Sequence, residues 1–375
     1  MQLPKHIPQL DVLRGIAVLE VMLYHAADLT PSLHLAPIVR LGYTGVDLFF
    51  VLSGFLITGI LVRCKDQPNY FRNFYARRAL RIWPIYYVLL FFTFIVLPLT
   101  VPSLKAAIFG LSRPWQSFPF FVQNLFTNGQ SVFDTVRVTW SLAIEEQFYL
   151  AWPIIVWLAP RRILKAWAFS ALLVSPFVRW SVMYGLIAPI NIYTNTITRL
   201  DGLALGAILA IWIPESDTRV VKYCGLAAPP AVLLIGAVSG WSNPGHWAFY
   251  TAVSLCFAGM LCAAINLPWV SNLSSLRYTG KISYALYLVH VPVIQFAAWG
   301  RRSLPIQNTM VSDFVLLAGS ISLSYGLAAL SWRFFESKIL EWKSRFEYSY
   351  EASPSPAVRA ASDADPSEVR ELALK

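Results

Sequence analysis

Long apolar runs alternate with short polar segments along most of the chain. A run of about 17–25 residues is long enough to cross roughly 30 Å of hydrocarbon as a helix. Ten such runs can be placed, over residues 10–29, 43–62, 83–99, 139–158, 165–186, 198–213, 224–240, 247–266, 283–300 and 311–330. The pattern predicts an all-α fold, a polytopic transmembrane helical bundle of about ten spans.

Two segments depart from this pattern. Residues 103–126 are apolar but interrupted by Arg113, Pro114 and Pro119. Since backbone at membrane depth that does not span must be shielded by protein, we expect a re-entrant or interfacial helical segment there. Residues 1–340 are predicted to form the transmembrane domain. Residues 341–375, rich in Ala, Ser, Pro and mixed charge, are expected to be a disordered cytoplasmic tail.

Lys and Arg residues are concentrated in alternate loops. They follow the second, fourth, sixth and eighth spans, whereas the opposite loops hold fewer. Because basic loops stay on the cytoplasmic side, this pattern predicts a multi-pass protein of the plasma (inner) membrane with both termini cytoplasmic. Counting residues 103–126 as a full crossing would put the later basic loops outside, so the charge pattern favours ten spans.

The composition supports a membrane protein. Hydrophobic residues make up 57% of the 375 residues and charged residues only 13%, whereas soluble domains carry about a quarter charged residues. The net charge of +10 follows the predicted topology, so no nucleic-acid partner is expected. The four Cys show no CxxC or other metal-ligand spacing, so neither a disulfide framework nor a metal site is expected.

The first apolar run carries ionisable residues that a membrane helix ordinarily avoids: Asp11, Arg14, Glu20 and His25. Each costs roughly 2.5–3.5 kcal/mol near a helix centre on insertion scales. Arg14 and His25 are eleven residues apart, which returns to within about 20° of the same helix face over a rise of about 16.5 Å. One face therefore presents a cation near its cytoplasmic end and an imidazole near its outer end.

Acidic residues enter the membrane at a similar depth to this imidazole. Asp47 and Glu145 begin the second and fourth spans from the outside. A carboxylate that orients an imidazole favours general-base chemistry at His25. At the cytoplasmic side, Arg78 and Arg81 lie one helical turn apart and, with Arg14, predict an anion site for phosphate.

Structural interpretations of the same residues remain open. His25 alone would also fit a packed core histidine, and Asp47 a helix cap. Of Glu145 and Glu146, one should face inward while the other reaches toward the interface.

Other polar residues also fit structural roles. The basic cluster 77–81, which includes Arg78 and Arg81, is more often a topogenic, lipid-facing patch than a ligand site. We interpret His290 as a packing histidine, and Arg199 with Asp201 as a buried ion pair.

Several motifs in order resemble the membrane-bound acyltransferase family 3. They are LDVLRGIAVLEVMLYHA with Arg14 and His25; GYTGVDLFFVLSGFLIT with Asp47, Ser53 and Gly54; RRALRIWPIYY with Arg78 and Arg81; and TWSLAIEEQFYLAWP with Trp140, Ser141, Glu145, Phe148 and Tyr149. RLDGLALGAILA and ISYALYLVHVPV resemble later segments of the family. The resemblance extends over nearly the whole chain before the predicted tail.

This resemblance implies an integral membrane enzyme that moves an acyl group, commonly acetyl, from acyl-CoA to hydroxyls of carbohydrates or other acceptors. Acyl-CoA (acetyl-CoA) would be the co-substrate, with no metal. The expected partners are acyl-CoA, the hydroxyl acceptor and the lipid bilayer. Some members carry an extracytoplasmic SGNH domain, and this chain resembles the stand-alone form.

The corresponding hypothesis assigns His25 as the general base, and Asp47 or Glu145 as the group that orients it or binds the acceptor. Arg14, Arg78 and Arg81 would bind coenzyme A. Ser141 and Tyr149 are candidates for substrate binding. The eight residues named in this hypothesis all occur in the motifs quoted above. A ping-pong route through an acylated His25 is an alternative.

Two other classes of function fit parts of the pattern. A transporter or exporter of glycans or small molecules could use intramembrane His, Glu and Asp as a proton relay, although the sequence has no inverted repeat. A non-catalytic scaffold could use the mixed-charge tail for docking, but it has no need of a base and a cation on one helix face. The motifs encode neither the acceptor, the acyl length nor the oligomeric state.

Overall fold

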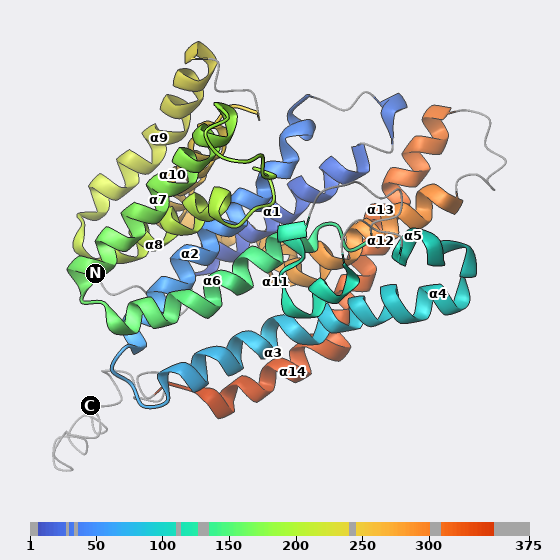
Figure 1. Cartoon of the computed structure of the whole chain (residues 1–375), viewed down its shortest axis with the longest axis horizontal. Coiled ribbons are helices and arrows are strands. Elements are labelled where there is room, and N and C mark those ends of the chain that lie inside the picture. The colour runs from blue at the N-terminus through green and yellow to red at the C-terminus, as the bar shows by residue number, and fades with distance from the viewer. Residues whose placement is uncertain are drawn as a thin grey trace, which may run out of the picture.

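The computed structural model describes residues 7–27, 30–33, 37–109, 114–126, 135–239, 245–300 and 309–348. Within these residues the regular structure is helical, and no strand occurs. Figure 1 shows α1 and α2 in the middle of the bundle, with α7 to α10 gathered on one side and α12 and α13 on the other. The predicted all-α fold is confirmed.

Each predicted span overlaps one of ten helices; the run 83–99 begins inside α3 and continues through η3 (Phe92–Val96) and α4 (Leu97–Thr100). The ten helices are α1 (Pro8–Ala27), α2 (Gly45–Cys64), α3 (Tyr70–Phe91), α6 (Thr139–Leu158), α7 (Arg161–Met183), α8 (Leu200–Trp212), α9 (Thr218–Ser239), α10 (Phe249–Ile265), α12 (Ser283–Gly300) and α13 (Thr309–Ser331). The periodicity of apolar residues therefore located the helices well.

The number of membrane crossings is a separate question. Among the described residues, four helical segments are long and apolar enough to span. A fifth qualifies if α11 (Ser274–Lys281) and α12, which meet at a bend of 75°, are one span. The 13 residues of α8 extend only about 20 Å, less than the hydrocarbon thickness. The helical bundle is that of a membrane protein, while ten crossings stays a prediction.

The predicted re-entrant or interfacial segment consists of short helices. They are η4 (Pro102–Leu104), α5 (Lys105–Phe109), η5 (Trp115–Phe120) and η6 (Gln123–Phe126). Tyr86 of α3 donates a hydrogen bond to the Phe118 carbonyl at 2.8 Å, and Gln123 donates to the Thr139 carbonyl at 2.9 Å. These bonds attach the segment to α3 and α6, so protein shields part of its backbone.

The chain stays helical for some residues after α13. It continues through η11 (Trp332–Glu336), α14 (Ser337–Glu341) and η12 (Trp342–Phe346). Figure 1 shows α14 beside α3, and Asn73 of α3 donates to the Glu347 carbonyl at 3.0 Å. The Tyr348 side chain is only 2% exposed. The described residues after 341 are thus packed against α3, while residues 349–375 lie outside the described residues and the tail stays a prediction.

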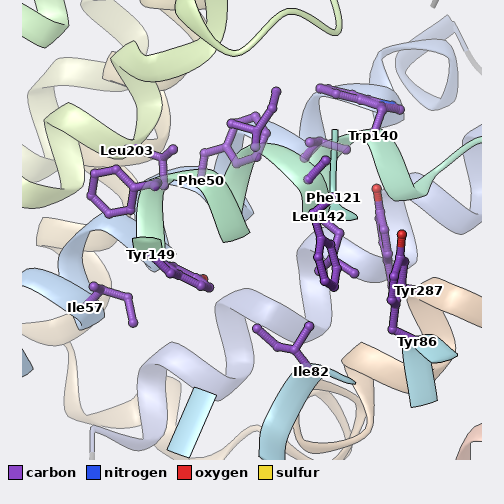
Figure 2. Packing of buried hydrophobic residues seen from close by; sticks show 14 of the residues in the cluster. Phe50, Ile57, Ile82, Tyr86, Phe121, Trp140, Leu142, Tyr149, Leu203 and Tyr287 are labelled. Atoms are coloured by element: carbon purple, nitrogen blue, oxygen red, sulfur yellow. The ribbon is translucent and has the colours of Figure 1, made fainter. Parts of the chain in front are cut away.

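Glycines allow α2 and α8 to pack closely. A Cβ added to Gly54 would lie 2.0 Å from the Leu203 carbonyl oxygen, and one added to Gly206 would lie 2.1 Å from the Val51 carbonyl oxygen. Small residues at such crossings let helix backbones approach in membrane proteins. Figure 2 shows Phe50 and Leu203, from these two helices, in the same buried cluster.

Candidate functional site

A cavity of about 800 Å³, including the part open to solvent, is lined by α1, α2, α3, α6 and α12. Its apolar wall includes Phe50, Ile57, Ile82 and Leu142, which Figure 2 shows with two tyrosines of the same cavity, Tyr149 and Tyr287. The polar lining is Arg14, Ser53, Arg78, Arg81, Ser141, Glu145, Tyr149, Ser283, Tyr284 and Tyr287. Six of the eight residues singled out from the motifs are in this lining; His25 and Asp47 are the two that are not.

Three arginines give the cavity its positive charge. Arg78 and Arg81 project from neighbouring turns of α3, and Arg14 comes from α1. Arg14 forms an ion pair with Asp11 at 3.2 Å. Within the described residues, the buried Nε of Arg78 has no hydrogen-bond partner. Among the described residues, Arg14 is the one of these three cations that is paired with a carboxylate at salt-bridge distance, so the group retains capacity to bind an anion.

Hydroxyl groups line the cavity beside the arginines. Ser53 and Tyr149 are hydrogen bonded to each other, and the Tyr149 ring lies 5.9 Å from the Arg78 guanidinium carbon. The Ser141 and Tyr287 hydroxyls are 2.6 Å apart. Tyr287 also donates to the Val138 carbonyl at 2.9 Å. These bonds fix the hydroxyls in place, and α6 supplies two of them.

The two adjacent glutamates have different surroundings. Glu145 lines the cavity, as the sequence predicted for one member of the pair. Glu146 accepts a hydrogen bond from the Trp83 indole N–H at 3.2 Å. Its other carboxylate oxygen is buried without a hydrogen-bond partner in the described part of the chain, so Glu146 does not reach freely to solvent.

Asp47 is committed to an ion pair. Its carboxylate is buried and accepts a hydrogen bond from Arg199 at 2.8 Å. The Arg199 guanidinium also stacks on Tyr250, 3.9 Å from the ring centroid. Asp47 does not contact His25, so its expected role in orienting that imidazole is not supported. The close crossing of α2 and α8 brings the first turn of one against the start of the other, which explains this pair.

The predicted pairing of Arg199 with Asp201 is therefore wrong. Asp201 instead accepts hydrogen bonds from Arg179 at 2.8 Å and from Thr251 at 2.7 Å. Arg179 lies on α7 and is buried. Adjacent positions at the start of α8 face different helices, which a one-dimensional pattern does not reveal.

His25 lies near the end of α1 and contacts a second histidine. Its Nδ1 is 2.9 Å from the Val21 carbonyl oxygen and 3.2 Å from His290 Nε2. The His290 ring lies 5.7 Å from the Tyr287 ring, and Tyr287 lines the cavity. The histidine pair is thus outside the cavity lining and adjoins it at Tyr287. Interpreting His290 as a packing residue missed this contact; the available signal was the three-residue spacing of Tyr287 and His290 on one helix.

The described residues contain no group of three or more His, Cys, Asp or Glu side chains that could hold a metal ion. The arrangement offers a cavity whose wall carries three cations together with a carboxylate and hydroxyl groups, and a histidine pair that contacts this wall at Tyr287.

Comparisons with known proteins agree with these features. The family model described as "Acyltransferase domain" matches residues 7–329. The O-acetyltransferase OatA of Staphylococcus aureus strain NCTC 8325 / PS 47 is 31% identical over 373 residues, covering 90% of this chain and 58% of that protein. OatA of strain COL gives the same values.

These relatives are longer than the present chain, which spans about 58% of the length of the curated relatives it matches. No solved structure matches. The family model covers most of the chain, including both helices that carry the Arg14, His25 and Arg78 positions. The chain belongs to the membrane-bound acyltransferase family 3.

Proposed function

We propose that the protein is an integral membrane O-acyltransferase that moves an acetyl group from acyl-CoA to a hydroxyl of a carbohydrate or glycoconjugate. The observation that carries the proposal is the cavity that combines Arg14, Arg78 and Arg81 with Glu145, Ser141 and Tyr149. Its family membership and the relatives named O-acetyltransferase OatA support the reaction class.

The arginine group would bind the donor. Coenzyme A carries its phosphates at the nucleotide end, and guanidinium groups bind phosphate oxygens with paired hydrogen bonds. The unpartnered Nε of Arg78 leaves a donor for this purpose. With the positive side facing the cytoplasm, the nucleotide would enter from there.

The acyl end would extend along the cavity. Arg14 and His25 lie on one uninterrupted helix, α1, about 16.5 Å apart along its axis. This length is comparable with an extended pantetheine arm. The apolar wall formed by Phe50, Ile57 and Leu142 suits the methylene groups of that arm better than its phosphates. The thioester would then lie toward the His25 end of the cavity.

Transfer would begin with proton removal. The Nε2 lone pair of His25 takes the proton of the acceptor hydroxyl, and the oxygen attacks the thioester carbonyl carbon. When the tetrahedral intermediate collapses, the C–S bond breaks and the thiolate takes the proton back from His25. The acceptor would approach His25 past Tyr287, the lining residue whose ring lies next to His290. Glu145, Ser141 and Tyr149 would position the acceptor or hydrogen bond the carbonyl oxygen.

The test is incubation of purified protein with acetyl-CoA and a panel of hydroxyl-bearing glycans, followed by measurement of free thiol and product mass. Acceptor-dependent thiol release and a product heavier by one acetyl group are expected. His25→Ala should abolish transfer while the protein still inserts in membranes. His246→Gln, which changes a histidine in the loop before α10, is the matched control and should retain turnover. Wild-type turnover in the His25 variant would refute the role of this base.

A further inference from the structure

Two histidines from distant parts of the sequence form a buried pair. His25 belongs to α1 and His290 to α12, and the Nδ1 of His25 is 3.2 Å from the Nε2 of His290. Their ring centroids are 5.1 Å apart. His290 is fully buried. A polar ring in such a place requires partners for its nitrogens.

The backbone contacts determine which nitrogens carry protons. A carbonyl oxygen only accepts hydrogen bonds, so the nitrogen facing it must be an N–H. His25 Nδ1 is 2.9 Å from the Val21 carbonyl, and His290 Nδ1 is 3.2 Å from the Leu286 carbonyl. Both neutral rings are therefore protonated at Nδ1, and both Nε2 atoms carry a lone pair.

This assignment makes His25 the donor and His290 the acceptor in the hydrogen bond between the rings. The Nδ1–H of His25 is shared between the Val21 carbonyl and the lone pair of His290 Nε2. The Nε2 of His25 is left unprotonated, which is the state a general base needs. His290 in turn is held by the Leu286 carbonyl and packs on the Tyr287 ring.

We propose that His290 is a positioning residue for His25, an inference that rests on the proposed function of His25 as the base. Its Nε2 accepts the Nδ1–H of His25, fixes the ring so that Nε2 faces the acceptor, and stabilises the positive charge that develops as His25 takes the proton. A neutral imidazole here fills the position that a carboxylate occupies in a Ser-His-Asp triad.

The described surroundings leave this task to His290. Within the described residues, no carboxylate is hydrogen bonded to His25, and Asp47, the carboxylate expected there, is bound to Arg199. The Val21 carbonyl also belongs to the helix that carries His25, so it restrains the ring within α1 only. His290 holds the His25 imidazole against a second helix, and its Nε2 lone pair is an additional acceptor for the Nδ1–H of His25.

The test compares His290→Leu with His290→Gln in acetyl-CoA titrations of purified protein. Leucine removes the acceptor, whereas the glutamine amide oxygen can still accept a hydrogen bond. Loss of a hydrogen bond to a charged group is expected to lower kcat about 10- to 150-fold in the leucine variant, with the KM for acetyl-CoA unchanged. The glutamine variant should recover part of that loss. His246→Gln serves again as the control and should match wild type.

Histidine ¹⁵N NMR of the purified protein supplies a readout that packing alone would not change. The wild-type spectrum should show His25, assigned by its absence in His25→Ala, protonated at Nδ1; in the leucine variant the Nδ1 resonance should shift, because that N–H keeps only the Val21 carbonyl as acceptor, and in the glutamine variant it should shift less. Wild-type kcat in both His290 variants, equal loss in both, or a change in KM alone would each overturn the positioning role. Turnover in His25→Ala would instead overturn the proposed function, so the two failures are distinguishable.

Discussion

Replacing Gly54 with alanine is expected to weaken the packing of α2 on α8. The added Cβ would lie 2.0 Å from the Leu203 carbonyl oxygen, whereas ordinary contacts of this kind are 3.4–4 Å. The neighbouring atoms belong to the backbone of Leu203, so no side chain can rotate away. The two helices would have to separate at a crossing that also positions Ser53 in the cavity wall.

The expected magnitude follows from two opposing terms. Overpacking of a tight interior costs about 1–3 kcal/mol, and a clash with backbone belongs to the upper part of that range. Alanine regains up to about 1 kcal/mol of helix propensity relative to glycine. The net result should be a loss of about 1–2 kcal/mol in the free energy of unfolding. Gly59, on the same helix, has no atom within 4 Å of an added Cβ, so Gly59→Ala should be neutral or slightly stabilising.

The assay is thermal unfolding in detergent, followed with a dye that becomes fluorescent on reaction with thiols. Cys64 on α2 and Cys262 on α10 are buried and react as the bundle opens, while the exposed Cys224 gives a constant background. Gly54→Ala should unfold at a lower temperature than wild type, and Gly59→Ala at the same temperature or higher. Equal or higher stability of Gly54→Ala would refute the argument from close helix approach.

Two further predictions concern charges. Arg78→Ala should raise the KM for acetyl-CoA about tenfold or more, because charge-assisted hydrogen bonds to phosphate are lost, with a smaller effect on kcat; an unchanged affinity in a binding titration would count against the phosphate role. Asp47→Asn should lower the free energy of unfolding by about 3–5 kcal/mol, since it leaves the buried charge of Arg199 uncompensated, and the same thiol-dye assay measures it. A melting temperature equal to that of wild type would show that the Asp47 ion pair contributes little.

The helices were predictable from the sequence because apolar periodicity is local. Each of the ten expected runs overlaps a helix, and several motif residues, such as Arg78 and Glu145, do line one cavity. The spacing of Arg78 and Arg81 within one helix was enough to place them together. The contacts of the residues after α14 were not visible in the composition, because Phe346 and Tyr348 pack on Arg72 and Arg77 of α3, far away in sequence.

The partners of the buried charges were not predictable in the same way. Asp47 and Arg199 are 152 residues apart, and their pairing depends on how closely α2 and α8 cross. The nearer candidate, Asp201, binds Arg179 instead. The contact between His25 and His290 spans 265 residues and likewise depends on which faces of α1 and α12 meet. A single sequence gives the residue types that form such pairs, but it does not show which residue pairs with which.

The attachment of the last described residues to α3 has a consequence for how the protein is made. Asn73 and Arg77, which hold the Glu347 and Phe346 carbonyls, precede Arg78 and Arg81 by less than three helical turns. During synthesis, α3 can form these contacts only after residues some 270 positions later have been made. Until residues 346 and 347 are in place, the turns of α3 next to Arg78 and Arg81 lack these two contacts, so that part of α3 is fully supported only after nearly all of the described helices have been made.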